Sequence, residues 1–331
     1  MLSSPPKSPA GPAPFRQPGS VRRTSSIDAD WPEGRNGAMR LIGRARDIAT
    51  PPDATDIVLL AQGAFEARID PDRHVLALNA SPSPAGLPQL VGERAGGHLR
   101  RAIDRVLPEE RRGGTPLHLI LDDIAGTSLI APWAWSRWDP DWLAQMQARK
   151  ADPKYAAAFN RENICTGLRT GSSGLSLMAE GVDAGQLRQP EDETGWHDFP
   201  AAPGPGMRRA RRIDVARDQL IRIDAHFQDS ATMPDGTRAA LHEYRILGSA
   251  DPVSLEILSL EAQPRVLPFV ECPDAAANMH RLVGKPLPLL REIVLDELRG
   301  IAGCTHLNDA LRALADVPAL LNYPMPAGAA L

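Results

Sequence analysis

Cysteine, aromatic residues and long apolar runs are all scarce in this sequence. Its 331 residues include three cysteines, too few for a disulfide scaffold, so we expect reduced thiols. No apolar stretch reaches the roughly 18 residues of a membrane helix, and the first residues lack the apolar core of a secretory signal. The net charge of −4 lacks the basic excess of a nucleic-acid-binding domain. These absences predict a cytoplasmic protein without a membrane or nucleic-acid partner.

The composition that is present predicts two α+β domains. A hydrophobic fraction of 43% is enough for a core, and the length suits roughly two domains. The first 36 residues are rich in Pro, Ser, Gly and Arg, which predicts a disordered tail and leaves open whether translation starts at Met1 or Met39. A Pro/Gly linker follows residue 200. We therefore expect a tail over 1–36, a smaller domain over 39–200, a second domain over 201–318 and a tail over 319–331.

Strand and helix signals alternate in the first domain. A helix carries Leu99 and Ile103 at helical spacing and ends before Pro108. Trp135 and Trp138 fit either the core or the wall of a pocket for a flat apolar ligand. The predicted strands are Ile57–Leu60, Ala64–Ile69, His74–Leu78, Leu117–Leu121 and Thr127–Ile130.

The second domain begins with period-two patterns and then changes to helical ones. Apolar and polar residues alternate over 221–228, which predicts a half-buried antiparallel strand. Pro234-Asp235-Gly236 predicts a turn, with strands over 238–247 and 253–260 after it. Helices are expected from Pro273, from near Pro288 and just after Cys304. The fold class is thus α+β, with an antiparallel meander packed by three helices.

A basic run, Arg208-Arg209-Ala210-Arg211-Arg212, precedes the first of these strands. Four arginines could form a phosphate-binding patch. A solvated sheet edge that discourages strand pairing is the interpretation we favour.

Cys272, Cys304 and His306 are the best chemical candidates. Both cysteines are expected at helix starts, where the helix dipole lowers the pKa of a thiol. His306 follows Cys304 by two residues, and zinc or iron binds thiolate and imidazole together. His242 and Asp229 are further candidates, as metal ligands or as a general base with its orienting carboxylate. The alternative is that these residues are structural parts of the core.

Several of these residues together resemble an uncharacterised bacterial family, domain of unknown function 2889. They are Arg211-Arg212-Ile213, Asp229, Leu241-His242-Glu243, Cys272-Pro273 and Gly303-Cys304-Thr305-His306-Leu307, and the resemblance covers about residues 195–317. It gives no catalytic assignment. It implies a role in the breakdown of aromatic or steroid-like small molecules.

A more distant resemblance is to iron–sulfur scaffold proteins of the IscU/SufU type. Leu282-Val283-Gly284-Lys285 and the late helix headed by Cys304 carry it. The first cysteine of those scaffolds has no counterpart before Cys272 in this module. If the fold is shared, Cys272 and Cys304 should lie close together.

Three functions follow from these patterns. The first is an enzyme of lyase or hydrolase type, with or without a metal, that acts on an apolar aromatic or polycyclic small molecule. The second is a metal-binding or iron–sulfur accessory protein. The third is a non-catalytic ligand-binding protein. No dinucleotide motif is present, and a homo-oligomer is left open.

Overall fold

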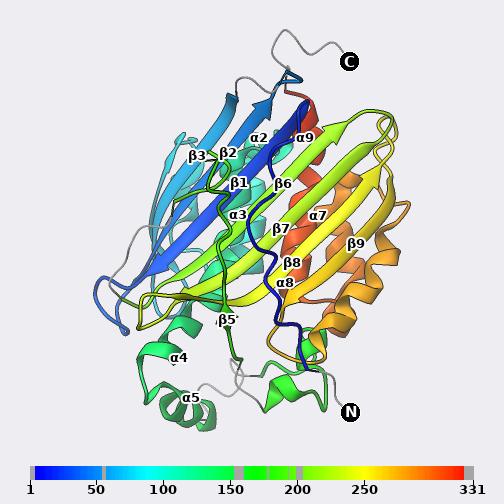
Figure 1. Cartoon of the computed structure of the whole chain (residues 1–331). Coiled ribbons are helices and arrows are strands. Elements are labelled where there is room, and N and C mark those ends of the chain that lie inside the picture. The colour runs from blue at the N-terminus through cyan, green and yellow to red at the C-terminus, as the bar shows by residue number, and fades with distance from the viewer. Residues whose placement is uncertain are drawn as a thin grey trace.

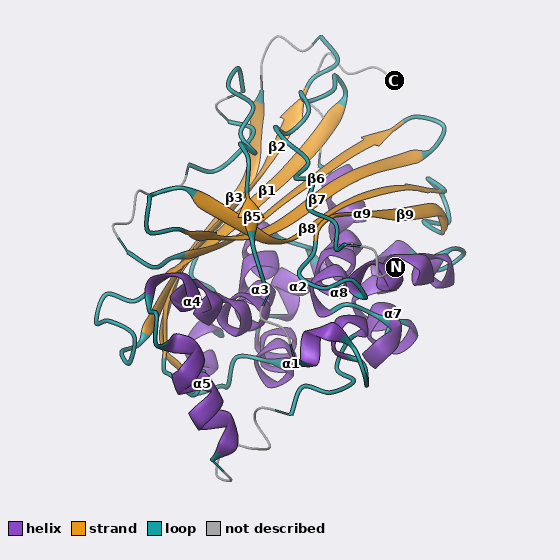
Figure 2. Cartoon of the chain, turned by 60° about the horizontal axis from the view of Figure 1, so that its bottom comes forward, coloured by secondary structure: helices purple, strands orange, loops and turns teal. Residues whose placement is uncertain are grey.

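One large antiparallel sheet with helices on a single face forms the protein (Figures 1 and 2). The computed structural model describes residues 4–53, 57–152, 160–176, 179–192, 194–198 and 204–323. The nine strands are ordered β4-β3-β2-β1-β6-β7-β8, after which both β5 and β9 pair with β8. This confirms the predicted α+β class and antiparallel meander. The sheet runs without a break through the strands on both sides of residue 200.

The strands are long and the helices short. The strands are β1 (Ser20–Asp30), β2 (Met39–Thr50), β3 (Val58–Ile69), β4 (Val75–Ser81), β5 (Val182–Asp183), β6 (Met207–Arg217), β7 (Ile221–Thr232), β8 (Arg238–Ala250) and β9 (Ile257–Val266). The α-helices are α1 (Gly97–Val106), α2 (Pro108–Arg112), α3 (Pro116–Ile130), α4 (Trp135–Trp138), α5 (Trp142–Ala151), α7 (Leu290–Glu297), α8 (Thr305–Arg312) and α9 (Val317–Leu321). A 3₁₀ helix spans Cys272–Leu282. Among the described helices, none has the length and apolarity to cross a bilayer.

Strand β1 corrects the prediction of a disordered tail. It lies in the middle of the sheet, hydrogen-bonded to β2 on one side and β6 on the other. Residues 4–19 run across the sheet face opposite the helices (Figure 1), where the amide of Ala10 donates to Glu243 at 2.7 Å. The prediction was wrong because it relied on the low apolar content of this segment, whereas β1 buries arginine, serine and threonine side chains. Arg22 and Arg23 bind the carboxylates of Asp214 and Asp47, so these cations are neutralised within the protein rather than by water.

Helix α3 replaces the two strands predicted at Leu117–Leu121 and Thr127–Ile130. Thr115 caps it by accepting a hydrogen bond from the amide of His118, and Pro116 is its first residue. Nearly all of its residues are buried on every side, so no polar stripe marks the helical period. A short, mostly apolar run such as Leu117–Leu121 does not by itself distinguish a buried helix from a strand.

The arginines of β1 and those of the basic run in β6 are buried, which corrects the solvated-edge interpretation. β6 is a central strand, and each arginine of its basic run is at most 4% exposed. On the helix side, Arg209 binds Asp229 and Asp309, and Arg211 binds Asp123 through two short contacts. Ion pairs on that side also join residues far apart in sequence: Arg23–Asp316, Arg100–Asp309 and Arg312–Asp122.

Two apolar cores lie beneath the sheet. One gathers side chains mainly from β6 to β9 and the C-terminal helices, and the other gathers them mainly from β1 to β4 and α1 to α3. The predicted helices at Pro288 and after Cys304 are confirmed as α7 and α8. Helix α9 extends past residue 318, and residues 324–331 of the predicted C-terminal tail lie outside the described residues.

Candidate metal centre

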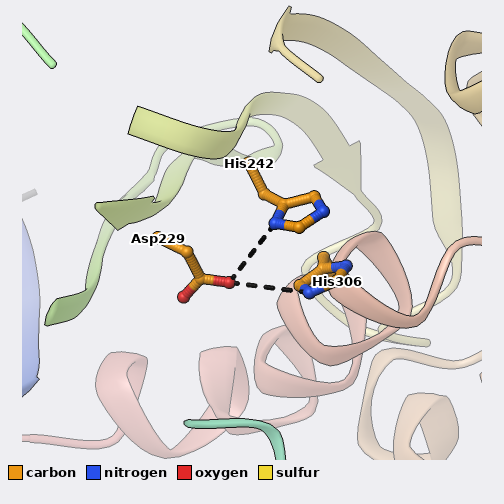
Figure 3. A group of neighbouring side chains, drawn as sticks. All are labelled: Asp229, His242 and His306. Atoms are coloured by element: carbon orange, nitrogen blue, oxygen red, sulfur yellow. Dashed lines mark ion pairs between the residues drawn. The ribbon is translucent and has the colours of Figure 1, made fainter. Parts of the chain in front are cut away.

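Asp229, His242 and His306 meet beneath the sheet, where β7, β8 and α8 come together (Figure 3). Their ligand atoms all lie within 4.8 Å of one another, and across the described residues they are the one such group found. Asp229 and His242 are direct neighbours on paired strands, just before a bulge in the register. His306 lies in the first turn of α8, two residues after its N-cap Cys304.

The two imidazole rings are stacked, and both present a nitrogen to the same carboxylate oxygen. The ring centroids are 3.4 Å apart at an interplanar angle of 13°. Oδ2 of Asp229 lies 3.9 Å from Nδ1 of His242 and 3.7 Å from Nε2 of His306. Both distances are too long for a hydrogen bond. Within the described residues, the buried Nδ1 of His242 has no hydrogen-bond partner at all.

Arg209 fixes the orientation of Asp229. Its Nε and Nη2 donate to the two carboxylate oxygens at 2.9 and 3.0 Å, and its Nη1 donates to Asp309 at 2.9 Å. Gly126 of α3 makes room for this guanidinium, because a Cβ at that position would lie 2.0 Å from Nη1. Each oxygen of Asp229 keeps a second lone pair for another partner.

Burial keeps both imidazoles neutral. It lowers the pKa of His242 well below the usual value, and the neighbouring His306 adds to this. Burial and then the charge of Arg209 lower the pKa of His306 to about 3. Neutral imidazole is the form that binds metals. A general base, in contrast, works best with a pKa near the working pH.

The cysteines gather in a neighbouring region and not at this centre. Cys272, Cys304 and Cys165 are free thiols; burial, and after it these three thiols, raises the pKa of Tyr244. Burial, and after it the neighbouring Cys304, raises the pKa of Cys272. Neither belongs to the cluster of Asp229, His242 and His306. Cys165 was not among the residues predicted from the sequence.

The expected lowering of the thiol pKa at helix starts is wrong. Cys304 is the N-cap of α8, whereas Cys272 is the first residue of its 3₁₀ helix and Glu271 is the N-cap. Burial raises the pKa of both thiols. The amides of Leu307 and His306 oppose the rise at Cys304, but the loss of water outweighs them.

Slow alkylation is therefore expected at all three cysteines. Burial raises the pKa of Cys165 to about 11, which lowers its thiolate fraction near neutral pH about a hundredfold relative to a free thiol. Iodoacetamide labelling at pH 7.5, followed by mass spectrometry, should be at least that much slower in the native protein than in urea. Rapid labelling of native Cys304 would contradict this account of its environment.

Other predicted features take structural roles. Glu243 points to the opposite sheet face from His242, and His226 is bonded to it there at 2.8 Å. Trp138 donates to the carbonyl of Thr232, and Trp135 packs edge-on against Trp31. The pocket predicted for these tryptophans stays a prediction.

Parts of the chain match known proteins. Residues 207–320 match the family described as protein of unknown function DUF2889. The chain is 29% identical over 156 residues to the uncharacterised protein SCO2128 of Streptomyces coelicolor, a match that covers 44% of this chain and 39% of that protein. The matched region is thus well under half the length of that relative. No solved structure matches the chain. The module that carries Asp229, His242 and His306 is therefore similar to a family of unknown function.

Proposed function

We propose that the protein is a metal-assisted enzyme of lyase or hydrolase type whose centre is formed by Asp229, His242 and His306. The observation that carries the proposal is the convergence of two neutral imidazoles and one carboxylate on a common point. Two histidines with one carboxylate are a ligand set for zinc or iron that leaves coordination positions open for water or substrate.

The distances fit a divalent ion after a small movement. Ligand atoms about 2.1 Å from a metal lie about 3.0–3.4 Å from one another. The oxygen–nitrogen separations of 3.7 and 3.9 Å are within about 1 Å of that range. The stacked rings must tilt apart so that both nitrogens point at one ion. The nitrogen of His242 that lacks a partner is the atom that such an ion would satisfy.

The chain supplies orientation and shielding around this centre. Arg209 holds both oxygens of Asp229, as outer-shell groups commonly do for metal ligands. Asp309 in turn binds Arg209. A divalent ion held here would polarise a substrate carbonyl or lower the pKa of a bound water. The proposed substrate is an aromatic or polycyclic small molecule, the class that the family resemblance implies.

A metal-binding accessory role is the second candidate, and burial favours it. Asp229 is fully buried, and 15% of the His306 side chain is exposed. A closed centre of this kind suits a structural or stored ion better than a reacting one. Cobalt(II) separates the two functions. Azide that changes the visible spectrum of the cobalt protein indicates an open coordination position, and an unchanged spectrum supports the accessory role.

Metal content is the direct test. Protein purified without oxygen and supplied with Fe(II) or Zn(II) should hold about one equivalent by elemental analysis. Asp229→Asn and His306→Gln should each lose it, because two protein ligands hold an exchangeable ion far more weakly than three. His280→Gln, at an exposed histidine outside the cluster, is the matched control and should keep the ion. A wild-type protein that takes up neither metal would refute the proposal.

A further inference from the structure

The two halves of the chain repeat one another in sequence and register. Strands β1 and β6 match at an offset of 186 residues, and β2 and β7 match at an offset of 182. The identical pairs are Arg22/Arg208, Arg23/Arg209, Ile27/Ile213 and Asp28/Asp214 in the first case, and Arg40/Arg222, Asp47/Asp229, Ala49/Ala231 and Thr50/Thr232 in the second.

Strands β1 and β6 meet about a local two-fold axis. Their pairing is centred on Ser25 opposite Arg211, two residues that are themselves 186 apart. Arg22 of β1 binds Asp214 of β6, and Arg208 of β6 binds Asp28 of β1. The two contacts are the same interaction made in both directions. A symmetric pair of this kind is typical of an interface between two copies of one unit.

Backbone features repeat as well. The register shifts directly after Asp47 in β2 and directly after Asp229 in β7. Arg73 and Leu255, 182 residues apart, both have positive φ values although neither is glycine. Gly92 and Gly284 both have positive φ and both end the same tripeptide, Leu-Val-Gly. A bulge and a left-handed residue depend on local geometry, so their repetition indicates equivalent backbones.

The repeat places a counterpart of the metal centre in the first half. Asp47 corresponds to Asp229, and Arg23 holds its two oxygens at 2.6 and 2.7 Å as Arg209 holds those of Asp229. The residue paired with Asp47 on the next strand is Ala61, where the second half has His242. Leu117 is the second residue after the N-cap of α3, and His306 is the second residue after the N-cap of α8.

We infer that the chain contains two copies of one unit and that the first copy is a latent metal site, with its carboxylate and arginine retained and both imidazoles absent. This inference rests on the proposed function of the second copy. In the first copy, the hydroxyl of Tyr323 donates to Asp47 at 2.9 Å and takes up the carboxylate oxygen that would otherwise face a ligand. The wild-type chain should therefore bind one ion and not two.

Restoring the two histidines tests the inference. The variant combines Ala61→His, Leu117→His and Tyr323→Phe, and it is titrated with Co(II) and examined by visible absorption and elemental analysis. We expect two equivalents against one in the wild type. The matched control carries glutamine in place of both new histidines in the same Tyr323→Phe background, and it should bind one.

The possible results separate the two proposals. One equivalent in both the wild type and the folded histidine variant would overturn this inference alone, and so would two equivalents in the wild type. A wild type that binds no metal would remove the proposed function together with this inference. Leu117 is fully buried, so circular dichroism must first show that the variant folds. If it does not, Ala61→His with Tyr323→Phe, at a half-buried position, should give a second, weaker cobalt site, and its absence would count against the inference.

Discussion

A chain that begins at Met39 is expected not to fold. It lacks β1, which hydrogen-bonds along its whole length to β2 and along nearly all of it to β6, so its loss splits the sheet and exposes two edges. It also removes Arg22 and Arg23 and leaves the buried Asp47 without its main counter-ion. An unpaired buried charge costs about 3–5 kcal/mol, a large part of the stability of an ordinary domain.

Circular dichroism, size-exclusion chromatography and urea unfolding would check this expectation. A chain that lacks only residues 1–3 is the control and should unfold as the full chain does. A soluble, cooperatively unfolding protein from Met39 would show that β1 is dispensable, in disagreement with its central position in the sheet.

Replacement of Arg209 by methionine should be the most damaging single substitution near the centre. Arg209 is 1% exposed and makes ion pairs with Asp229 and Asp309, so methionine leaves both carboxylates without their shared cation. We expect a loss of about 3–5 kcal/mol in the free energy of unfolding, measured by urea titration. Lysine should recover only part of it, since one ammonium group cannot bind both oxygens of Asp229 in the fork geometry of a guanidinium.

The control for this substitution is Arg222→Met. Arg222 is an exposed arginine on β7 whose partner Asp218 is also exposed, and such pairs contribute about 0–1 kcal/mol. A loss at Arg209 no greater than the loss at Arg222 would mean that water or other groups compensate the two carboxylates. The positioning role of Arg209 would then be wrong.

Local chemistry made much of the C-terminal module predictable. Alternation over residues 221–228 predicted a strand that is observed as β7, and Pro234-Asp235-Gly236 predicted the turn before β8, where Gly236 has φ +84°. The apolar spacing in α7 and the start of α8 after Cys304 followed from helix periodicity and capping. Each of these elements is specified by neighbouring residues, which sequence patterns report well.

Strand β1 and the grouping of the site residues could not be predicted from the sequence, because both depend on residues that are distant in the chain. The polar strand β1 is stable only because carboxylates from distant elements, such as Asp214 and Asp316, neutralise its arginines. Likewise, no local signal separates His242 and His306, which join Asp229, from Cys272 and Cys304, which do not. The bulge after Asp229 and the docking of α8 decide which side chains meet, and both depend on tertiary packing.

The buried charges that cross between the halves have a consequence for unfolding. Asp316 of the second half neutralises Arg23 of the first, and Asp123 of the first neutralises Arg211 of the second. Each repeat therefore depends on carboxylates of the other to neutralise its buried arginines. Separation of the two repeats would leave buried arginines and carboxylates without these partners. Although its architecture is that of two linked subunits, we therefore expect the molecule to unfold as a single cooperative unit, with both repeats lost together.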